Sequence, residues 1–281
     1  MSDREEDPAG ASPSPAELLE VAVAAARAGG AVLVEGLSRP KQVELKTERA
    51  SIVTWADVTA QRDIIELIQS HYPDHAILAE ETVPEKLREA EAAGAPTWLI
   101  DPLDGTSNYA HGIPFACTSV AVRDAAGLAA GAIFEPFREE LFTASRGGGA
   151  WLGDVRLGVT ATEQLDRALV CTGVQSDEPE ALAAFGRRVV ALMTQCRGAR
   201  CLGSPALCLA YIAAGRIDGF LERDATYAWD VGAGGLMIAE AGGRIEDLDG
   251  GALNLGPGLA NVLATNGRIH DALAELARHS A

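Results

Sequence analysis

The sequence predicts a mixed fold in two parts, an α+β half followed by an α/β half. After two helical segments, short β-like runs alternate with turn signals as far as about residue 155, which is typical of a meandering, largely antiparallel sheet. Beyond that point β-like runs alternate with helical stretches, which favours an α/β arrangement. We therefore expect a boundary near residue 155, with one subdomain over 14–155, which carries the metal motif described below, and a second over 156–281.

The composition is that of a globular protein. The 281 residues are 48% hydrophobic and 22% charged, which allows a sizeable core, and the formal net charge of −17 argues against nucleic acid as a partner. No apolar run approaches the roughly 18 residues of a membrane helix, and the acidic start does not resemble a secretory signal. We expect a cytoplasmic protein with no membrane partner. The cysteines, which form no CxxC pair, are expected to be small buried residues, including Cys196, Cys201 and Cys208.

The first helix is predicted directly after a polar tail. Residues 1–13 contain four acids and two prolines and almost nothing to bury, so this segment is expected to be disordered. Ser14, Pro15 and Glu17 then match an N-cap, a first helical position and a capping-box glutamate. Apolar residues at helical spacing continue this helix towards Gly29 or beyond.

The remaining elements follow from periodicity and turn residues. A second helix is expected after Thr54 and ends before Pro73. The charge-rich stretch from Val83 to Gly94 has little to bury and is expected to be an exposed connection. The β-like runs of the first half are Ala76 to Leu78, Trp98 to Ile100, Ser119 to Val122, Ala130 to Phe134, Glu140 to Ala144 and Ala150 to Leu152. Those of the second half are Ala168 to Cys171, Gly219 to Leu221, Arg244 to Leu248 and Val262 to Thr265, with helices near 180–195, 204–215, 231–241 and 269–279.

Most of the chemical information lies in the segment WLIDPLDGTSNYAHGIPF. An apolar strand delivers Asp101 and Asp104 at its carboxyl end, where sheets of this kind commonly place a ligand. The Leu103 carbonyl is available as another oxygen ligand, and the amides of Gly105 and Thr106 can open a short helix that attracts a phosphate. These groups fit a metal-bound phosphate. Aspartates beside proline and glycine also form ordinary turns, and the motif alone favours that alternative.

Two other segments offer carboxylates. Asp230, in WDVGAGGLMIAEAGG, is expected to be the N-cap of a helix that stops at Gly242, and serves either as a cap alone or as a cap that is also a ligand. Glu80 and Glu81 follow a β-like run, and would repel each other if they were buried without a cation; a solvated loop pair is the alternative. Because neither histidines nor cysteines occur at zinc-ligand spacing, carboxylates must hold any metal.

Together these segments resemble the inositol monophosphatase family, within the group of metal-dependent, lithium-sensitive phosphatases that includes fructose 1,6-bisphosphatases. The family's central motif is present as DPLDGTSNY and its second motif as WDVGAGGLMIAEAGG. The paired-glutamate motif is present as AEET, and the K…V-T-x-x-D element as Lys46, Val53, Thr54 and Asp57. The resemblance runs from about Lys46 to the C-terminus and implies a layered sandwich of alternating helix and sheet layers, together with a homodimer.

The resemblance also implies a set of site residues. Two or three Mg²⁺ ions would be held by Glu80, Asp101, the Leu103 carbonyl, Asp104 and Asp230. The implied catalytic residues are Thr106, which would orient the attacking water through a hydrogen bond with Asp57, and also Glu81 and Lys46. The implied substrate-binding residues are Asp104, Gly105, Thr106, Ser204, Pro205, Glu222 and Asp230.

The function predicted on this basis is that of a Mg²⁺-dependent phosphomonoesterase, in which metal-activated water hydrolyses a small polyol or sugar phosphate. Departures from the family pattern leave the substrate open. Ala79 and Ser51 replace a usual glycine and a frequent aspartate, Pro205 replaces a small residue, and one extra residue separates Glu222 from Asp230. The alternatives are the same chemistry on histidinol phosphate, 3′-phosphoadenosine 5′-phosphate, fructose 1,6-bisphosphate or dinucleotide phosphates, and a phosphate-binding scaffold without turnover.

Overall fold

The structure is a computed structural model that describes residues 12–39, 43–45, 52–81 and 95–279. Lys46, Ser51, the connection from Val83 to Gly94 and all but the end of the tail over 1–13 lie outside the described residues.

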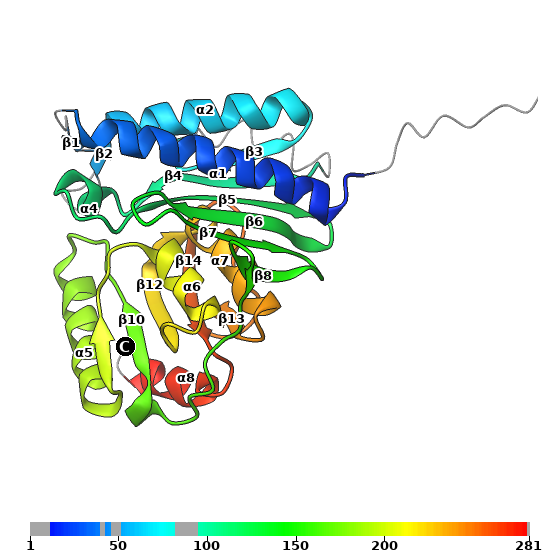
Figure 1. The fold of residues 1–281 in the computed structure, drawn as a ribbon. Helices are drawn as coiled ribbons and strands as arrows, with labels where there is room; N and C mark the ends of the chain where they lie inside the picture. Colours follow the sequence, from blue (N-terminus) through cyan, green and yellow to red (C-terminus); the bar gives the residue numbers. More distant parts are fainter. Residues whose placement is uncertain (1–11, 40–42, 46–51, 82–94, 280–281) are drawn as a thin grey trace, which may run out of the picture.

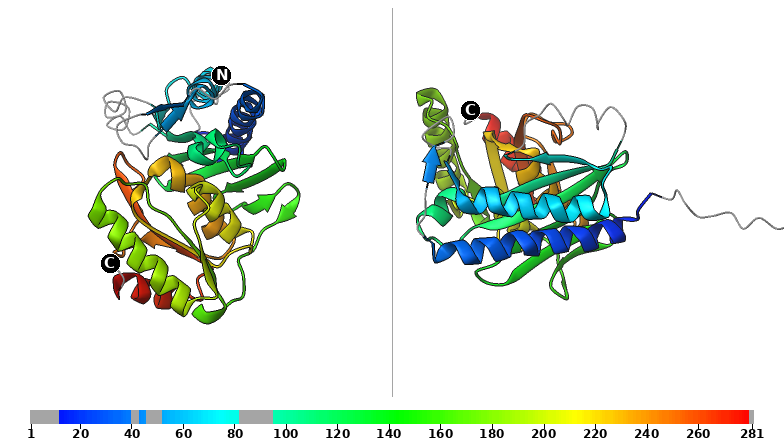
Figure 2. Two further views of the ribbon diagram at one scale, coloured as in Figure 1. Left: turned by 90° about the vertical axis from the view of Figure 1, so that its left-hand side faces the viewer. Right: turned by 90° about the horizontal axis from the view of Figure 1, so that it is seen from above.

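Helices and sheets alternate in layers (Figure 1). The helices are α1 (Pro15–Leu37), α2 (Trp55–His71), α4 (Thr106–Ala110), α5 (Pro179–Gln195), α6 (Pro205–Ala213), α7 (Ala228–Glu240) and α8 (His270–His279), with a 3₁₀ turn, η1 (Leu165–Arg167). α1 and α2 lie side by side over one face of a seven-stranded sheet, as both views of Figure 2 show. α6 and α7 lie between this sheet and a five-stranded sheet, whose far face is covered by α5 and α8. This order confirms the predicted layered sandwich.

The seven-stranded sheet is the predicted meander. Its strands follow the chain order, with only β3 and β4 parallel and every other neighbouring pair antiparallel. The strands are β3 (Ala76–Ala79), β4 (Thr97–Asp104), β5 (Cys117–Asp124), β6 (Gly127–Glu135), β7 (Glu140–Ser145), β8 (Gly149–Leu152) and β9 (Val155–Arg156). A separate antiparallel pair is formed by β1 (Val43–Leu45) and β2 (Ile52–Thr54).

The five-stranded sheet is mixed, in the order β11-β10-β12-β14-β13. β10 is parallel to both β11 and β12, whereas β14 is antiparallel to its neighbours β12 and β13. The strands are β10 (Leu169–Thr172), β11 (Gly198–Arg200), β12 (Gly219–Tyr227), β13 (Arg244–Asp247) and β14 (Leu259–Thr265). The boundary near residue 155 stays a prediction, and α7, from the second half of the chain, packs on the sheet of the first.

Helix α1 continues past Gly29 to Leu37, because the two central glycines are packing positions. A Cβ on Gly29 would lie 2.7 Å from Thr118 of β5, and one on Gly30 would collide with the ring of Phe134 in β6. Glycine inside a helix costs about 1 kcal/mol relative to alanine, which close packing of the helix on the sheet offsets here.

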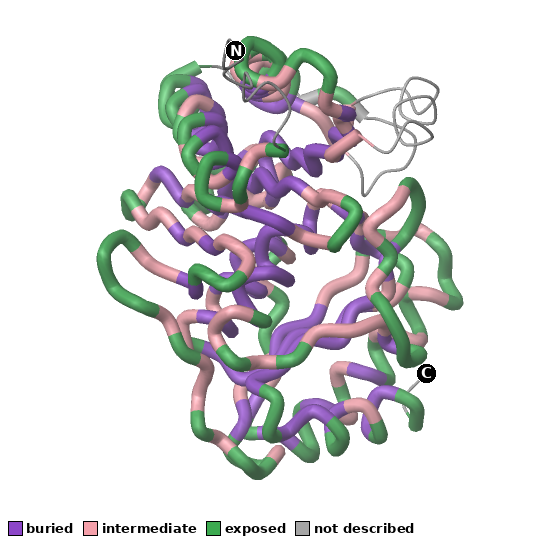
Figure 3. The backbone as a smooth tube through the Cα atoms, turned by 90° about the vertical axis from the view of Figure 1, so that its right-hand side faces the viewer, coloured by how far each residue is buried: buried purple, intermediate pink, exposed green. Residues whose placement is uncertain are grey.

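Buried residues follow the layers, as the purple segments of Figure 3 show. On β4, Trp98 and Ile100 belong to the apolar core under α1 and α2, whereas Leu99 belongs to the core that includes α6 and α7. β4 therefore has apolar layers on both faces, and its carboxyl end opens at the boundary between them. None of the helices in the described ranges combines the length and the apolar character that a bilayer span requires.

Candidate active site

Asp101 and Asp104 lie at the carboxyl end of β4, as predicted, and both are buried. Leu99 faces α7, where a Cβ on Gly232 would lie 2.7 Å from Leu99 Cδ1. Asp101, two residues further along the strand, is placed on this same face by the strand period. The Leu103 N–H donates to Asp101 Oδ1 at 3.0 Å, which fixes the carboxylate across the turn.

Asp230 reaches the site from α7, but not as the N-cap that the sequence predicted. Helix α7 begins at Ala228 because Tyr227, the last residue of β12, is extended and takes the N-cap position. Asp230 is therefore at the third helical position, where its Oδ2 accepts a hydrogen bond from the Tyr227 N–H at 2.7 Å. This reach-back contact occupies one carboxylate oxygen and orients the other.

Asp104 is held by the N-terminus of α6, a hundred residues away in sequence. Its Oδ2 accepts hydrogen bonds from the Ser204 hydroxyl and, at 2.8 Å, from the Ala206 N–H. Ser204 is the N-cap of α6, followed by Pro205 at the first helical position. In the structure the Ser204 hydroxyl contacts Asp104, and its contact with substrate stays a prediction. Sequence alone signals the cap through Ser-Pro, but not its partner.

The three aspartates converge. Asp101, Asp104 and Asp230 are 2%, 4% and 8% exposed, and each offers an oxygen within 4.8 Å of the other two. Desolvation raises the pKa of Asp104 to about 7, against the hydrogen bonds from Ser204 and Ala206, which lower it. Desolvation and the neighbouring carboxylates raise the pKa values of Asp101 and Asp230 well above the ordinary range.

Glu80 and Glu81 follow β3 at the same edge of the sheet. The Glu80 N–H donates to the Ile100 carbonyl at 3.2 Å, which places Glu80 beside the strand that delivers Asp101. The charge of Glu80 contributes to the raised pKa values of Asp101, Asp104 and Asp230. The Glu81 N–H donates to Gln61 Oε1 at 2.9 Å.

Thr106 and Asp57 form the second part of the site. Asp57 is the third residue of α2, and its Oδ2 accepts hydrogen bonds from the Thr54 N–H and hydroxyl, both at 2.6 Å. Its other oxygen, Oδ1, lies 3.2 Å from the Thr106 hydroxyl, which also lies 3.0 Å from the Leu103 carbonyl. The Thr106 proton is thus directed at these two acceptors.

Gly105 begins the short helix α4, as predicted. Its φ of 90° is left-handed, and a Cβ there would lie 2.9 Å from the Phe115 carbonyl. Both constraints favour glycine. Asn108, in the same helix, donates to the carbonyls of Phe115 and Leu202 at 2.9 and 2.7 Å, and so ties the motif to the chain before α6. Asn108 had no predicted role beyond its place in the motif.

Glu222 lies in the middle of β12, directly after the residue that pairs with the end of β10, and is 5% exposed. Burial, and then the charge of Asp104, raises its pKa to about 8, while Arg188 opposes the rise. Arg188 of α5, which the sequence argument did not identify, is also buried. The cysteine expectation needs one correction, because Cys201 is exposed at the end of β11 whereas the other four thiols are buried.

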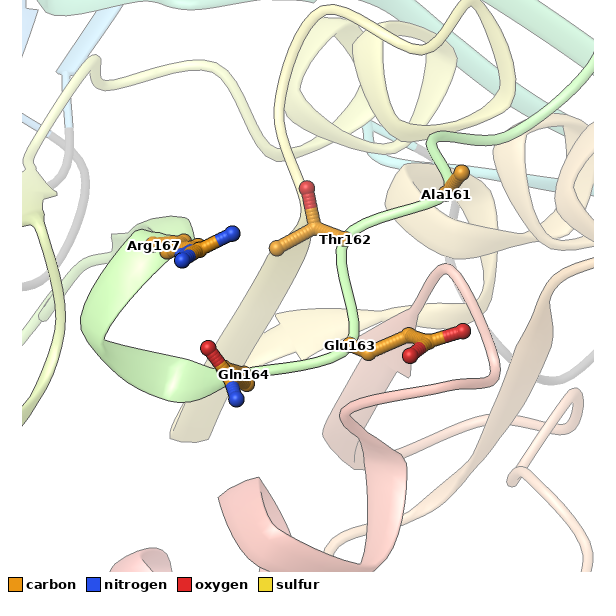
Figure 4. Close-up of a pocket in the computed structure, with 5 residues that line it drawn as sticks. All are labelled: Ala161, Thr162, Glu163, Gln164 and Arg167. Atoms are coloured by element: carbon orange, nitrogen blue, oxygen red, sulfur yellow. The ribbon is translucent and has the colours of Figure 1, made fainter.

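A surface hollow elsewhere in the chain contains none of the predicted site residues. Figure 4 shows its lining along the segment that leads into η1. The lining residues are Ala161, Thr162, Glu163, Gln164 and Arg167. The hollow offers one carboxylate, which already pairs with Arg268 at 2.9 Å, so it lacks the convergent groups of the acidic cluster.

Comparisons with known proteins identify the family. A model described as the inositol monophosphatase family matches residues 14–281. An inositol-1-monophosphatase of Synechocystis sp. is 37% identical over 265 residues, which cover 93% of this chain and 90% of the relative. A protein of Haemophilus influenzae named Nus factor SuhB is 37% identical over 254 residues, which cover 90% of this chain and 92% of the relative.

A solved structure has the same fold. The IMPase of Thermotoga maritima superimposes with a TM-score of 0.82 at 32% sequence identity, over 93% of this chain and 97% of the other. The similarity therefore includes both sheets and the helices between them.

Proposed function

Because the chain belongs to the inositol monophosphatase family, we propose that it is a Mg²⁺-dependent phosphomonoesterase that hydrolyses phosphate esters of small polyols or sugars. One observation carries the proposal. Asp101, Asp104 and Asp230, from a strand and a helix far apart in sequence, bring buried carboxylate oxygens within 4.8 Å of one another. Bringing buried carboxylates this close together costs free energy, and a bound divalent cation offsets that cost.

The donor set fits Mg²⁺. Hard oxygen ligands suit this ion, and among the described residues no arginine or lysine forms an ion pair with the three aspartates. The groups that would hold the ions are the side chains of Glu80, Asp101, Asp104 and Asp230 and the carbonyl of Leu103. When bound, Mg²⁺ supplies a Lewis acid that activates water and stabilises charge on the leaving oxygen.

The protein's own groups orient the reactants. Because the Thr106 proton is directed at Asp57 and the Leu103 carbonyl, its oxygen lone pairs are left to accept a hydrogen bond from the attacking water. Glu81 follows directly after Glu80 and is proposed to assist the same water. The backbone amides at Gly105 and Thr106, where α4 begins, are proposed to donate to phosphate oxygens.

The proposal is tested by phosphate release. The protein is assayed at fixed Mg²⁺ with inositol 1-phosphate, histidinol phosphate, 3′-phosphoadenosine 5′-phosphate and fructose 1,6-bisphosphate. We expect release that excess EDTA abolishes and excess Mg²⁺ restores, with polyol or sugar phosphates preferred. Release that continues unchanged in EDTA contradicts the metal mechanism. Phosphate binding without release from any ester indicates a scaffold.

We further propose a cytoplasmic homodimer. Leu182, Val190 and Met193 are exposed apolar residues on one side of α5, and such a row supports an interface between subunits. Light scattering measures the mass in solution, and a monomer mass contradicts the dimer.

A further inference from the structure

The two deeply buried residues of α5 are Arg188 and Leu192. Leu192 belongs to the apolar cluster that contains Val170 of β10 and Leu221 of β12. Arg188 comes four residues earlier, on the same side of the helix and one turn closer to its N-terminus. Since α5 connects β10 to the parallel strand β11, Arg188, near the middle of α5, is closer than Leu192 to the end of β10. β10 ends at Thr172, whereas β12 continues to Tyr227.

Arg188 is a buried charge without a direct partner. It is 5% exposed, and no hydrogen bond or ion pair joins its guanidinium to another residue in the described parts of the chain. A guanidinium has five N–H donors, and burial without acceptors is costly. The surroundings of Arg188 therefore provide a site for an acceptor that the described part of the chain does not supply.

Two buried oxygen atoms that lack a hydrogen-bond partner in the described chain lie near the end of β10. Among the described residues, neither Glu222 Oε2 nor Thr172 Oγ1 has a hydrogen-bond partner, and both atoms are buried. Thr172 ends β10 and pairs with Leu221, the residue before Glu222. A Cβ on Gly173 would collide with Glu222 Oε1, which places the Glu222 carboxylate over the end of β10.

The two opposite charges act on each other without contact. Burial is the main cause that lowers the pKa of Arg188, and Arg223 lowers it further, whereas Glu222 and Asp224 raise it. Glu222 in turn is influenced by Asp104 of the acidic cluster and, with the opposite sign, by Arg188. Glu222 thus connects the acidic cluster electrostatically with Arg188.

A hydroxyl group satisfies both side chains, because it can donate to a carboxylate and accept from a guanidinium. An anionic group in the alcohol part of a ligand would be repelled by Glu222, Asp104 and Asp224. A cationic group would be repelled by Arg188, since Arg223 already pairs with Asp249. Opposite charges that cancel each other therefore favour a neutral group that is both donor and acceptor.

We propose that Arg188 is a specificity-determining residue that donates a hydrogen bond to a hydroxyl oxygen in the alcohol part of the substrate, while Glu222 accepts the proton of that hydroxyl. The inference rests on the proposed function and narrows the substrates to phosphate esters of polyhydroxy alcohols. The phosphate binds at the acidic cluster, and the alcohol part extends to the end of β10.

Two esters that differ only in ring hydroxyls provide the test, namely myo-inositol 1-phosphate and cyclohexyl phosphate. Loss of a hydrogen bond from a charged donor predicts that Arg188→Met raises KM for the inositol ester about 10-fold to 100-fold, with little change in kcat. The same variant leaves both constants for cyclohexyl phosphate within about twofold, and Arg188→Lys recovers part of the loss. Arg187 is exposed on the same helix, so Arg187→Met is the matched control and changes neither ester.

Equal losses on the two esters, or no loss on either, overturn the assignment. So does a wild-type protein that hydrolyses both esters equally well. Circular dichroism reports whether Arg188→Met folds; if it does not, the KM of Arg188→Lys decides. If the wild type releases phosphate neither from these two esters nor from the other esters of the panel above, the proposed function fails. The role of Arg188 is then judged by calorimetry with free myo-inositol and Mg²⁺, where equal binding by wild type and Arg188→Met overturns it.

Discussion

The two edges that meet at the site differ in how their charged groups are held. At the end of β4, each of Asp101, Asp104 and Asp230 accepts at least one backbone hydrogen bond from a turn or a helix start. Near the end of β10, Arg188 and Glu222 are equally buried, yet the described chain gives no partner to the guanidinium or to Glu222 Oε2. The carboxylates at the end of β4 are fixed before any ligand binds, whereas the groups near the end of β10 keep donors and acceptors that a ligand can use.

This difference separates the groups proposed to carry out the reaction from those proposed to select the substrate. The hydrogen bonds at the first edge fix oxygen atoms that are proposed to hold ions, and this geometry does not depend on the alcohol part of a substrate. The uncompensated polar atoms at the second edge cost free energy until a ligand with matching groups arrives, and such sites discriminate strongly against analogues that lack those groups. Changes at the first edge should therefore affect all substrates, and changes at the second only some.

The largest expected effect comes from Asp104→Asn. Asparagine keeps an acceptor for Ser204 or the Ala206 N–H but loses a charge from the cluster. Since metal catalysis contributes several kcal/mol to lowering the barrier, we expect kcat/KM to fall at least about 1000-fold for both myo-inositol 1-phosphate and cyclohexyl phosphate. Steady-state kinetics at several Mg²⁺ concentrations measures the loss.

The control for this variant is Asp166→Asn, which removes an exposed carboxylate from η1 and should leave both constants unchanged. If Asp104→Asn retains more than about a tenth of wild-type kcat/KM, a value that corresponds to about 1.4 kcal/mol, the acidic cluster does not organise the reaction. A loss confined to the inositol ester would instead assign Asp104 to selection, and so remove the distinction between the two edges.

Thr106→Ala is expected to have a smaller effect. It deletes the hydroxyl that lies 3.2 Å from Asp57 Oδ1 and 3.0 Å from the Leu103 carbonyl, but no carboxylate. We expect kcat to fall about 100-fold and KM to remain nearly constant, because the hydroxyl is proposed to orient water rather than to bind the ester. Thr106→Ser keeps the hydroxyl and is the matched control. A Thr106→Ala variant that raises KM without lowering kcat would contradict this role.

The fold was largely predictable because its signals are local. The capping box at Ser14 and the alternation of β-like runs with turn residues fix the first half of the chain. The end of α1 was not predictable, because Gly29 and Gly30 stop a helix in most local contexts and are tolerated here only through contacts with Thr118 and Phe134. Those contacts depend on strands about ninety to a hundred residues later.

The site, too, was predictable only in part. Asp101, Asp104 and Thr106 lie in one short motif, so their proximity could be argued from the sequence. Asp230 was predicted at the N-cap of α7 but lies at its third helical position, because Tyr227 gives no capping signal in the sequence. Arg188 was not identified at all, since an arginine amid an amphipathic helix is normally solvent-exposed, and only the packing of α5 on β10 and β12 buries it.

The smallest expected effect is the pH dependence of stability without metal. The pKa of Asp104 is raised from 3.8 to about 7 in the folded protein, so between these values the folded state binds more protons than the unfolded state. Stability from this group is therefore present below about pH 4 and is lost as the pH rises to about 7. Asp104→Asn lacks the titrating group, so in EDTA its Tm should rise relative to that of wild type as the pH increases from about 4 to about 7.

Thermal unfolding of both proteins in EDTA between pH 4 and pH 8 measures this gain. Because a kcal/mol corresponds to about 2–4 °C in a chain of this size, we expect a relative increase of several degrees in the variant's Tm. Carboxylates away from the cluster cancel in the difference, since groups such as Asp124 and Glu246, whose pKa values are lowered, titrate in both proteins. Added Mg²⁺ should then raise the Tm of wild type more than that of Asp104→Asn. A Tm difference that is constant with pH would mean that neither burial nor the neighbouring carboxylates destabilise ionised Asp104, and the carboxylates at the end of β4 would then need no cation.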